Sequence, residues 1–323
     1  MKKKLLVCTF SGGRTSAFMA KFISELPNYK DNYEIVFVFC NTGKEREETL
    51  QFVKDCQDNW LLNIVWLEAK VNTGRVGTTF NVVDFKTASR NGEPFEEMLK
   101  KYPMPNNFAS NCTRELKMRP IEKYVKSLIE LKEFKKFAFK IKAKIRPNFY
   151  KDNLYKTGSL YKYFLKNKIQ SNITVYTAMG IRKDEEHRRS NRAIKDNVIY
   201  PLMDDIQVDS KFIRSWWDKQ PFDLMLKDYE GNCDLCFKKS TRKKLTIIKE
   251  NPKIADWWLD MEEKYSSEIV PRFDLRTNYG IIDLIELTKK PFKTIQDLHE
   301  LNKNQASMFD EMDSETDCFC KAN

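Results

Sequence analysis

Short apolar runs alternate with amphipathic stretches in the N-terminal part of the chain. The runs at 5–10, 34–39 and 62–67 are rich in β-branched and aromatic residues, and their length is typical of buried strands. The stretches between them, at 17–23 and 45–58, place apolar residues at helical spacing. Strands that alternate with helices predict right-handed βαβ units and therefore a parallel sheet.

The same pattern returns after a helical interruption. Residues 92–104 predict a short helix followed by a proline-marked loop, and residues 115–145 predict a long helix. Strand patterns follow at 173–181 and 198–202. Beyond them the chain carries helical patterns, at 210–219, 238–250, 252–264 and 293–303.

These patterns predict an α/β fold, a doubly wound and mostly parallel sheet of the Rossmann type. The sheet domain is expected in residues 1–205, with a basic helical insertion at 118–170. A helical C-terminal region that carries a cysteine site is expected in residues 206–323.

The loop Ser11-Gly12-Gly13-Arg14-Thr15-Ser16 joins the first predicted strand to the first predicted helix. Its glycines allow a phosphate to approach the backbone closely, and its hydroxyl groups add hydrogen-bond donors. The N-terminus of a helix also attracts anions. The GxxxxGK[ST] spacing of a Walker A loop is absent. The loop therefore predicts phosphate binding, with an ordinary turn capped by Ser11 or Ser16 as the alternative.

Two further polar segments follow predicted strands. Asn41, Thr42 and Gly43 come directly after the second strand, where Asn41 could hydrogen-bond a base or a ribose. Residues 180–189 follow a later strand and carry several charges. Because ligands of doubly wound folds bind at the carboxyl ends of the strands, both segments belong to the candidate site.

The segment at 180–189 carries the charges that a phosphate site needs. Arg182 and Arg188 suit phosphate or sulfate, which arginine binds through two parallel hydrogen bonds. Asp184 or Glu185 could hold Mg²⁺ or orient an arginine. The alternative is a solvated helix start with acids at its N-terminus.

The positive charge of the chain is concentrated in one window. The formal net charge is +11, and residues 121–170 hold 13 lysines and one arginine against four acids. Ten aromatic residues lie in the same window. Lysines neutralise phosphates and aromatic rings stack on unpaired bases, so the window predicts nucleic-acid contact. The alternative is a helical hairpin whose aromatic residues form its own core.

The composition indicates a cytoplasmic protein. No run of 18 or more apolar residues is present, so we expect no membrane span. The apolar stretch after the Met-Lys-Lys-Lys start is short and leads directly into the glycine loop, which argues against export. Eight cysteines in such a chain suggest metal or redox chemistry more than disulfides.

The cysteines are spaced in a way that suggests one soft metal site. Cys233 and Cys236 form a C-x-x-C pair, Cys112 stands alone, and the C-terminus carries Cys318 and Cys320. Four thiolates would suit Zn²⁺ or a [4Fe–4S] cluster. The predicted ligands are Cys112, Cys233, Cys236 and one of the C-terminal pair, with Cys320 preferred. The alternative is a C-x-x-C pair without a metal.

Taken together, these motifs resemble the phosphoadenosine phosphosulfate (PAPS) reductase family within the N-type ATP pyrophosphatases, an adenine nucleotide alpha hydrolase-like superfamily. The glycine loop resembles SGGxxS, and Asn41-Thr42-Gly43 resembles the D-T-G after strand two. Residues 180–188 resemble G-I-R-x-D-E-x-x-R. Cys112 with Glu115-Leu116-Lys117-x-x-Pro120 and the later C-x-x-C are also similar to family segments.

The resemblance implies an adenine nucleotide, ATP or else PAPS or adenylyl sulfate, across the strand ends. It implies phosphate contacts from the glycine loop and a base near Asn41-Thr42-Gly43. The other implied binding residues are Lys117, Gly180 and Arg182. The implied catalytic residues are Ser11, Ser16, Arg182, Asp184 and Arg188. Family members are commonly oligomeric, so a homo-oligomer is expected as well.

Two positions depart from the family pattern. Thr15 stands where ATP pyrophosphatases usually have a Mg²⁺-binding Asp, and Asn41 replaces the Asp of D-T-G. Three functions follow as hypotheses. The first is an ATP pyrophosphatase that adenylates a substrate, for nucleic-acid modification or sulfur transfer. The second is a PAPS or adenylyl-sulfate reductase that forms a thiosulfonate on Cys318 or Cys320 and releases sulfite. The third is a non-catalytic nucleotide- or nucleic-acid-binding protein.

Overall fold

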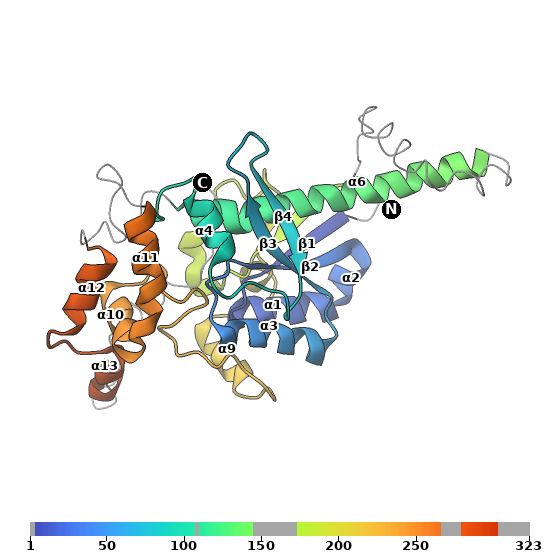
Figure 1. The fold of residues 1–323 in the computed structure, drawn as a ribbon. Coiled ribbons are helices and arrows are strands. Elements are labelled where there is room, and N and C mark those ends of the chain that lie inside the picture. The colour runs from blue at the N-terminus through green and yellow to red at the C-terminus, as the bar shows by residue number, and fades with distance from the viewer. Residues whose placement is uncertain (1–3, 107–109, 145–172, 266–278, 303–323) are drawn as a thin grey trace.

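A six-stranded sheet lies at the centre of the molecule (Figure 1). The computed structural model describes residues 4–106, 110–144, 173–265 and 279–302. The strands share one sheet in the order β4-β3-β2-β1-β5-β6 and are β1 (Lys4–Phe10), β2 (Tyr33–Asn41), β3 (Ile64–Val71), β4 (Thr78–Val83), β5 (Val175–Ala178) and β6 (Val198–Ile199). All neighbours are parallel except β3 and β4. The predicted mostly parallel α/β sheet is confirmed.

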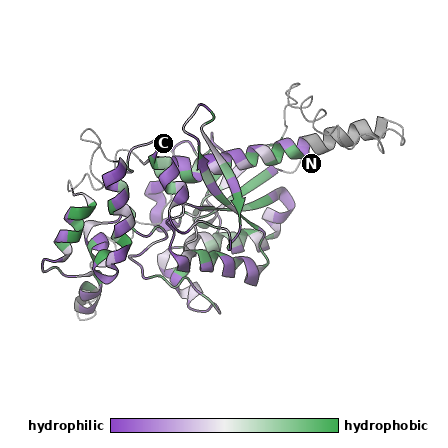
Figure 2. Ribbon diagram, viewed as in Figure 1, coloured by the Kyte–Doolittle hydropathy of each residue, from purple (hydrophilic) through white to green (hydrophobic). Residues whose placement is uncertain are grey.

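Helices cover both faces of this sheet, as the doubly wound prediction requires. On β1, Leu6 and Cys8 face a core shared with α1 (Arg14–Glu25) and α3 (Glu47–Trp60), whereas Leu5 and Val7 face α6 (Arg119–Lys144). Side chains of a strand alternate between the two faces, so apolar residues at successive positions are needed when both faces are covered. In Figure 2 the central strands are accordingly hydrophobic along their length.

The remaining helices are short. In the sheet half they are α2 (Pro27–Asn32), α4 (Glu93–Leu99), α5 (Asn111–Thr113), α8 (Pro201–Asp204) and α9 (Ser210–Trp217). In the C-terminal part they are α10 (Thr241–Glu250), α11 (Asp256–Tyr265), α12 (Ile281–Thr288) and α13 (Ile295–Asn302). A π-helical turn at Arg114–Met118 precedes α6, and 3₁₀ turns lie at Lys183–Arg188 and Pro252–Ala255.

The C-terminal helices build a second core with α4. Leu235 and Trp258 pack there against Phe95, Met98 and Leu116 from the first half of the chain. In contrast, Trp217 of α9 packs in the sheet core with α1 and α3. The sheet half and the C-terminal half are therefore joined by apolar contacts, and the boundary expected near residue 205 stays a prediction.

Some elements differ from the sequence prediction. The antiparallel edge strand β4 and the helix α12 were not predicted. Val82 in β4 is exposed, and Phe80 of the strand packs against Tyr124 of α6, which is distant in sequence. The predicted strand at 173–181 is shortened to Val175–Ala178, since Gly180 and Arg182 turn away toward α1.

The long helix α6 begins beside the strand ends and runs past the sheet (Figure 1). Its 26 residues correspond to about 39 Å at 1.5 Å per residue. Of the basic window at 121–170, residues 145–170 lie outside the described residues. Among the helices that the structure describes, none is long and apolar enough to cross a membrane.

Three cysteines, Cys8, Cys40 and Cys56, are buried in the core of the sheet domain. Burial raises the pKa of the Cys40 thiol to about 12 and raises the pKa values of Cys8 and Cys56 as well. Burial disfavours the charged thiolate, and the thiolate is the form that reacts with alkylating agents. Cys112 and Cys233 are only half-buried.

We expect brief treatment of the native protein with iodoacetamide at about pH 8 to modify Cys112 or Cys233 before Cys8, Cys40 and Cys56. Peptide mass spectrometry measures the modified fraction of each cysteine. Labelling in urea serves as the control, because all five thiols should then react. Early modification of the three core thiols in the native protein would contradict this packing.

Candidate functional site

The loop at the start of α1 is closed by its own hydroxyl groups. The Ser16 hydroxyl accepts a hydrogen bond from the Ser11 backbone N–H at 3.1 Å and donates one to the Gly13 carbonyl at 2.9 Å. The Ser11 hydroxyl lies 2.9 Å from the Ser16 hydroxyl. The N–H groups of the first turn of a helix lack intrahelical partners, so this closed loop presents donors to a ligand.

Gly12 is required by the backbone of this loop. Its φ is +84°, in the left-handed region that favours glycine. A Cβ atom at this position would lie 2.6 Å from Cγ2 of Thr49 on α3. The close approach of α3 therefore also demands glycine at position 12.

The strand order reverses between β1 and β5, which is where doubly wound folds bind ligands. A pocket with a volume of about 260 Å³ opens there at the strand ends. It is lined by apolar and polar residues from β1, β5, β6, the start of α6 and the turns beside them, including Thr9, Lys117, Ile121, Thr177, Arg188 and Tyr200.

Lys117 lies between the pocket and the glycine loop. It lines both the main pocket and a smaller one that includes Ser11. The π-helical turn places it there, and such turns are frequent at functional sites. The Lys117 side chain is about nine-tenths buried, and its ammonium lies 3.4 Å from a carboxylate oxygen of Glu45. A buried cation is thus placed beside the loop with a compensating acid.

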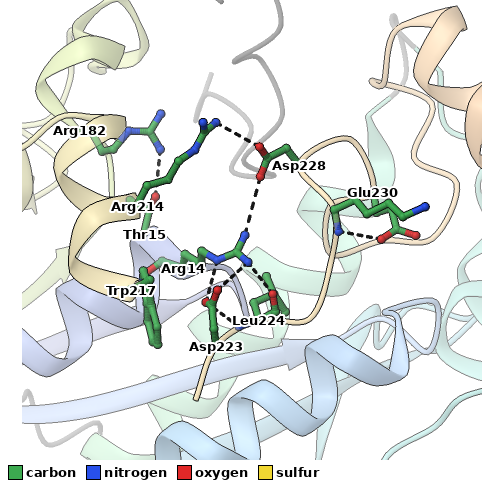
Figure 3. A network of polar contacts seen from close by, with 10 residues as sticks. Arg14, Thr15, Arg182, Arg214, Trp217, Asp223, Leu224, Asp228 and Glu230 are labelled. Atoms are coloured by element: carbon green, nitrogen blue, oxygen red, sulfur yellow. Dashed lines mark hydrogen bonds and ion pairs between the residues drawn. The ribbon is translucent and has the colours of Figure 1, made fainter. Parts of the chain in front are cut away.

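Arg182 connects the segment after β5 to the start of α1, as Figure 3 shows. Its guanidinium donates a hydrogen bond to the Thr15 hydroxyl at 2.9 Å and to Asp184 at 3.0 Å, and it lies 3.4 Å from Glu185. Arg188 forms an ion pair with the same Glu185. The two acids therefore orient the arginines, which was one of the two roles predicted for them.

Gly180 brings these elements together. A Cβ atom on Gly180 would lie 3.3 Å from the Cα atom of Ser16, a tight contact with backbone. The structure therefore places the Gly180–Arg188 segment directly against the glycine loop. The sequence placed both segments in one candidate site because each follows a predicted strand of a doubly wound fold.

Arg14 faces away from the helix N-terminus and toward the C-terminal half (Figure 3). It binds both carboxylate oxygens of Asp223, at 2.7 and 2.8 Å, and the Leu224 carbonyl at 2.6 Å. Asp228 lies 3.9 Å away. The indole N–H of Trp217 donates to the Arg14 carbonyl at 3.1 Å. These contacts give Arg14 a structural role, and its predicted ligand contact stays a prediction.

Asn41, Thr42 and Gly43 form a buried turn. The Asn41 amide donates to Glu68 at 2.6 Å and to the Ser89 carbonyl at 2.8 Å, and its oxygen accepts the Gly43 N–H at 3.1 Å. The hydrogen-bonding groups of Asn41 are thus used within the protein. The base contact predicted for this turn stays a prediction.

The predicted cysteine ligands lie only partly within the described residues. Cys112 and Cys233 pack against the second core, which contains Cys236. Cys318 and Cys320 fall outside the described ranges. Within those ranges, no group of three or more histidine, cysteine or acidic residues is arranged to hold a metal ion. The four-thiolate site, whose fourth ligand lies outside the described ranges, therefore stays a prediction.

A comparison with known protein families identifies the family of this chain. The family model for the phosphoadenosine phosphosulfate reductase domain matches residues 5–197. The chain belongs to this family. The PAPS reductase match includes the glycine loop, the Asn41 turn, Lys117 and the arginine segment. Family members are generally enzymes that bind PAPS, adenylyl sulfate or ATP-like nucleotides, so a nucleotide-related function is supported.

The relatives have no assigned activity in their names. The uncharacterized nin region protein ORF290 of Escherichia phage lambda is 28% identical over 241 residues, which is 73% of this chain and 67% of the relative. The uncharacterized protein MJ0066 of Methanocaldococcus jannaschii is 25% identical over 156 residues, 46% of this chain and 27% of the relative. No solved structure gave a significant match.

Several residues of the site were not found from the sequence. Thr9 and Thr177 line the pocket, but in the sequence nothing distinguishes them from other strand residues. Tyr200 was included in a predicted strand without a role. Asp223 has no local motif, because its partner Arg14 is distant in the chain. Alternation along β1 was the one available signal, since it places Thr9 on the face of Leu5 and Val7.

We expect Gly12→Ala to destabilise the protein more than Gly77→Ala. Both positions have positive φ, which costs about 1 to 2 kcal/mol for a non-glycine residue. Only Gly12 has a close neighbour, because no atom lies within 4 Å of a Cβ at Gly77. Urea unfolding measures both. Equal losses in the free energy of unfolding would show that Thr49 does not constrain the loop.

Proposed function

We propose that this protein is an ATP pyrophosphatase that adenylates an acceptor substrate. The observation that carries the proposal is the closed glycine loop at the N-terminus of α1, with Arg182 and Lys117 beside it. A triphosphate offers the charge that such a set of donors and cations favours. The family match supports a nucleotide, and the intact SGGxxS loop favours one that releases pyrophosphate.

In this reaction a nucleophilic oxygen of the acceptor attacks the α-phosphorus of ATP. The bond between the α-phosphorus and the oxygen bridging to the β-phosphorus breaks, and pyrophosphate leaves with the electron pair. The acceptor loses its proton to solvent. The backbone N–H groups of the loop and Arg182 would stabilise the charge that develops on pyrophosphate.

The pocket beside Lys117 suits the nucleoside. It adjoins the loop, and its walls include apolar side chains for a planar ring. Magnesium is the metal that ATP chemistry usually involves, and it would neutralise phosphate charge. Thr15 and Asp184 both accept hydrogen bonds from the guanidinium of Arg182. We therefore assign no protein carboxylate to the metal.

A nucleic acid is the acceptor class that the charge distribution favours. Residues 121–170 carry most of the net positive charge. The helix that begins this window, α6, has Ile121 and Glu122 in the pocket wall and carries the exposed Lys123 and Lys126 further along. A nucleic-acid strand bound to this helix would lie close to the proposed adenylation site.

The second candidate is a sulfonucleotide reductase. The observation that favours it is the C-terminal pair Cys318 and Cys320, either of which could attack the sulfur of PAPS or adenylyl sulfate. The thiolate would form a thiosulfonate and displace the nucleotide, and an external thiol would then release sulfite.

The two candidates differ in their products. The purified protein is incubated with ATP, Mg²⁺ and RNA or single-stranded DNA, and pyrophosphate and AMP-linked product are measured. A parallel incubation with PAPS or adenylyl sulfate and a dithiol measures sulfite. Pyrophosphate release that depends on nucleic acid supports adenylation. Sulfite release alone, lost in Cys318→Ser/Cys320→Ser, would replace it with the reductase.

We expect Arg182→Lys to lower kcat/KM for pyrophosphate release by about 100-fold. Lysine keeps the charge but lacks the planar fork that spans Thr15 and Asp184. Arg90→Lys is the matched control, because Arg90 pairs with Glu47 on the surface and should behave as wild type. Equal kinetics for the two variants would remove Arg182 from the reaction.

A further inference from the structure

A short segment of the C-terminal half reaches the glycine loop directly. The side-chain amide of Asn232 donates a hydrogen bond to the Ser11 carbonyl at 2.6 Å. Asn232 is only 7% exposed, and it lies outside the region matched by the family model. The loop is therefore contacted by a residue that the family domain does not contain.

This segment is held firmly in place. The Arg46 N–H donates to the Asn232 carbonyl at 3.0 Å, and the Asp234 N–H donates to the Lys44 carbonyl at 2.9 Å. Residues 45 and 233 form an antiparallel bridge. The segment 230–236 thus runs beside the chain that follows the Asn41 turn, through backbone hydrogen bonds on both sides of that bridge.

Two ion pairs reinforce this docking. Arg46 binds Glu230 at 2.7 Å, and Lys44 binds Asp234 at 2.8 Å. All four side chains are largely buried. The indole N–H of Trp258 donates to Asp234 at 2.9 Å, which links the segment to the second core. Asn232 therefore approaches Ser11 from a rigid support.

The orientation of the Ser11 carbonyl determines the direction of the Gly12 N–H group. In a trans peptide, the carbonyl of Ser11 and the N–H of Gly12 belong to one planar group and point in opposite directions. The structure contains no cis peptide bonds among the described residues. A donor that holds the carbonyl on one side therefore fixes the Gly12 N–H on the other side.

We propose that Asn232 is a positioning residue, which aims the Gly12 N–H at a bound phosphate by holding the Ser11 carbonyl. This inference rests on the proposed phosphate site. It adds that the C-terminal segment 230–236 is part of that site. By linkage, phosphate binding must stabilise the docked segment to the same extent that the docked segment favours phosphate binding.

The test uses inorganic pyrophosphate and the full-length protein. Asn232→Asp keeps the shape of the side chain but replaces the donor by an oxygen that repels the Ser11 carbonyl. Asn59→Asp is the matched control, because the Asn59 amide also donates to a carbonyl, that of Asp55 on α3, at an exposed position. Calorimetry measures pyrophosphate affinity, and hydrogen exchange measures the amides of Arg46 and Asp234.

We expect the wild type and Asn59→Asp to bind pyrophosphate and to slow exchange of both amides on binding. Asn232→Asp should bind at least about tenfold more weakly, since one tenfold step corresponds to the loss of a single hydrogen bond. In Asn232→Asp, pyrophosphate should no longer slow the exchange of the Arg46 and Asp234 amides. A merely structural role for Asn232 would lower the melting temperature and leave the affinity unchanged.

The outcomes separate this inference from the proposed function. Binding by the wild type with unchanged affinity in Asn232→Asp overturns the positioning role and leaves the phosphate site intact. Absence of binding by the wild type overturns the phosphate site and the inference together. If Asn232→Asp does not fold, Glu230→Gln is measured instead. It keeps Asn232 but loosens its support, so a two- to fivefold loss of affinity is expected and unchanged affinity overturns the proposal.

Discussion

The reversal of strand order between β1 and β5 is the constraint on which the site depends. The carboxyl ends of parallel strands lie at one edge of the sheet. A crevice opens at this edge where the segments that follow two neighbouring strands turn to opposite sides. The glycine loop leaves β1 on one side of it, and the segment from Gly180 to Arg188 leaves β5 on the other. The 3.3 Å approach of a Gly180 Cβ position to Ser16 shows how closely the two exits meet. The topology of the sheet therefore brings together the two segments that the sequence predicted as phosphate-binding.

The cations at this crevice are compensated by acids of the same chain. Lys117 lies near Glu45, and Arg182 lies near Glu185, with all four residues buried. An unpaired buried charge would be costly, so these acids allow the cations to be present before a ligand arrives. In the phosphate site that we propose, a ligand would share these cations with Glu45 and Glu185.

Sequence patterns predicted the parts of this site that follow from local order. The glycine loop, Arg182 and Lys117 stand at strand ends or helix starts, where motif and topology agree. The contacts of Asp223 and Asn232 could not be predicted, because each reaches its loop partner across about two hundred residues of chain. The Asn41 turn was recognised by its position, but its internal hydrogen bonds to Glu68 and Ser89 depend on tertiary packing. The edge strand β4 was missed for a similar reason, since its Phe80 packs against Tyr124 of α6.

The C-terminal half holds the glycine loop at several points. Trp217 donates a hydrogen bond to the Arg14 carbonyl, and Asp223 accepts one from the Arg14 guanidinium. Asn232 donates a hydrogen bond to the Ser11 carbonyl. These three contacts fix both ends of a loop that glycine would otherwise leave mobile. Preorganised donors stabilise developing charge without the cost of reorientation during the reaction. The C-x-x-C pair begins one residue after Asn232, so any ligand or modification that moved these cysteines would also move a support of the loop. The C-x-x-C pair and the glycine loop are therefore coupled through one short, firmly docked segment of the chain.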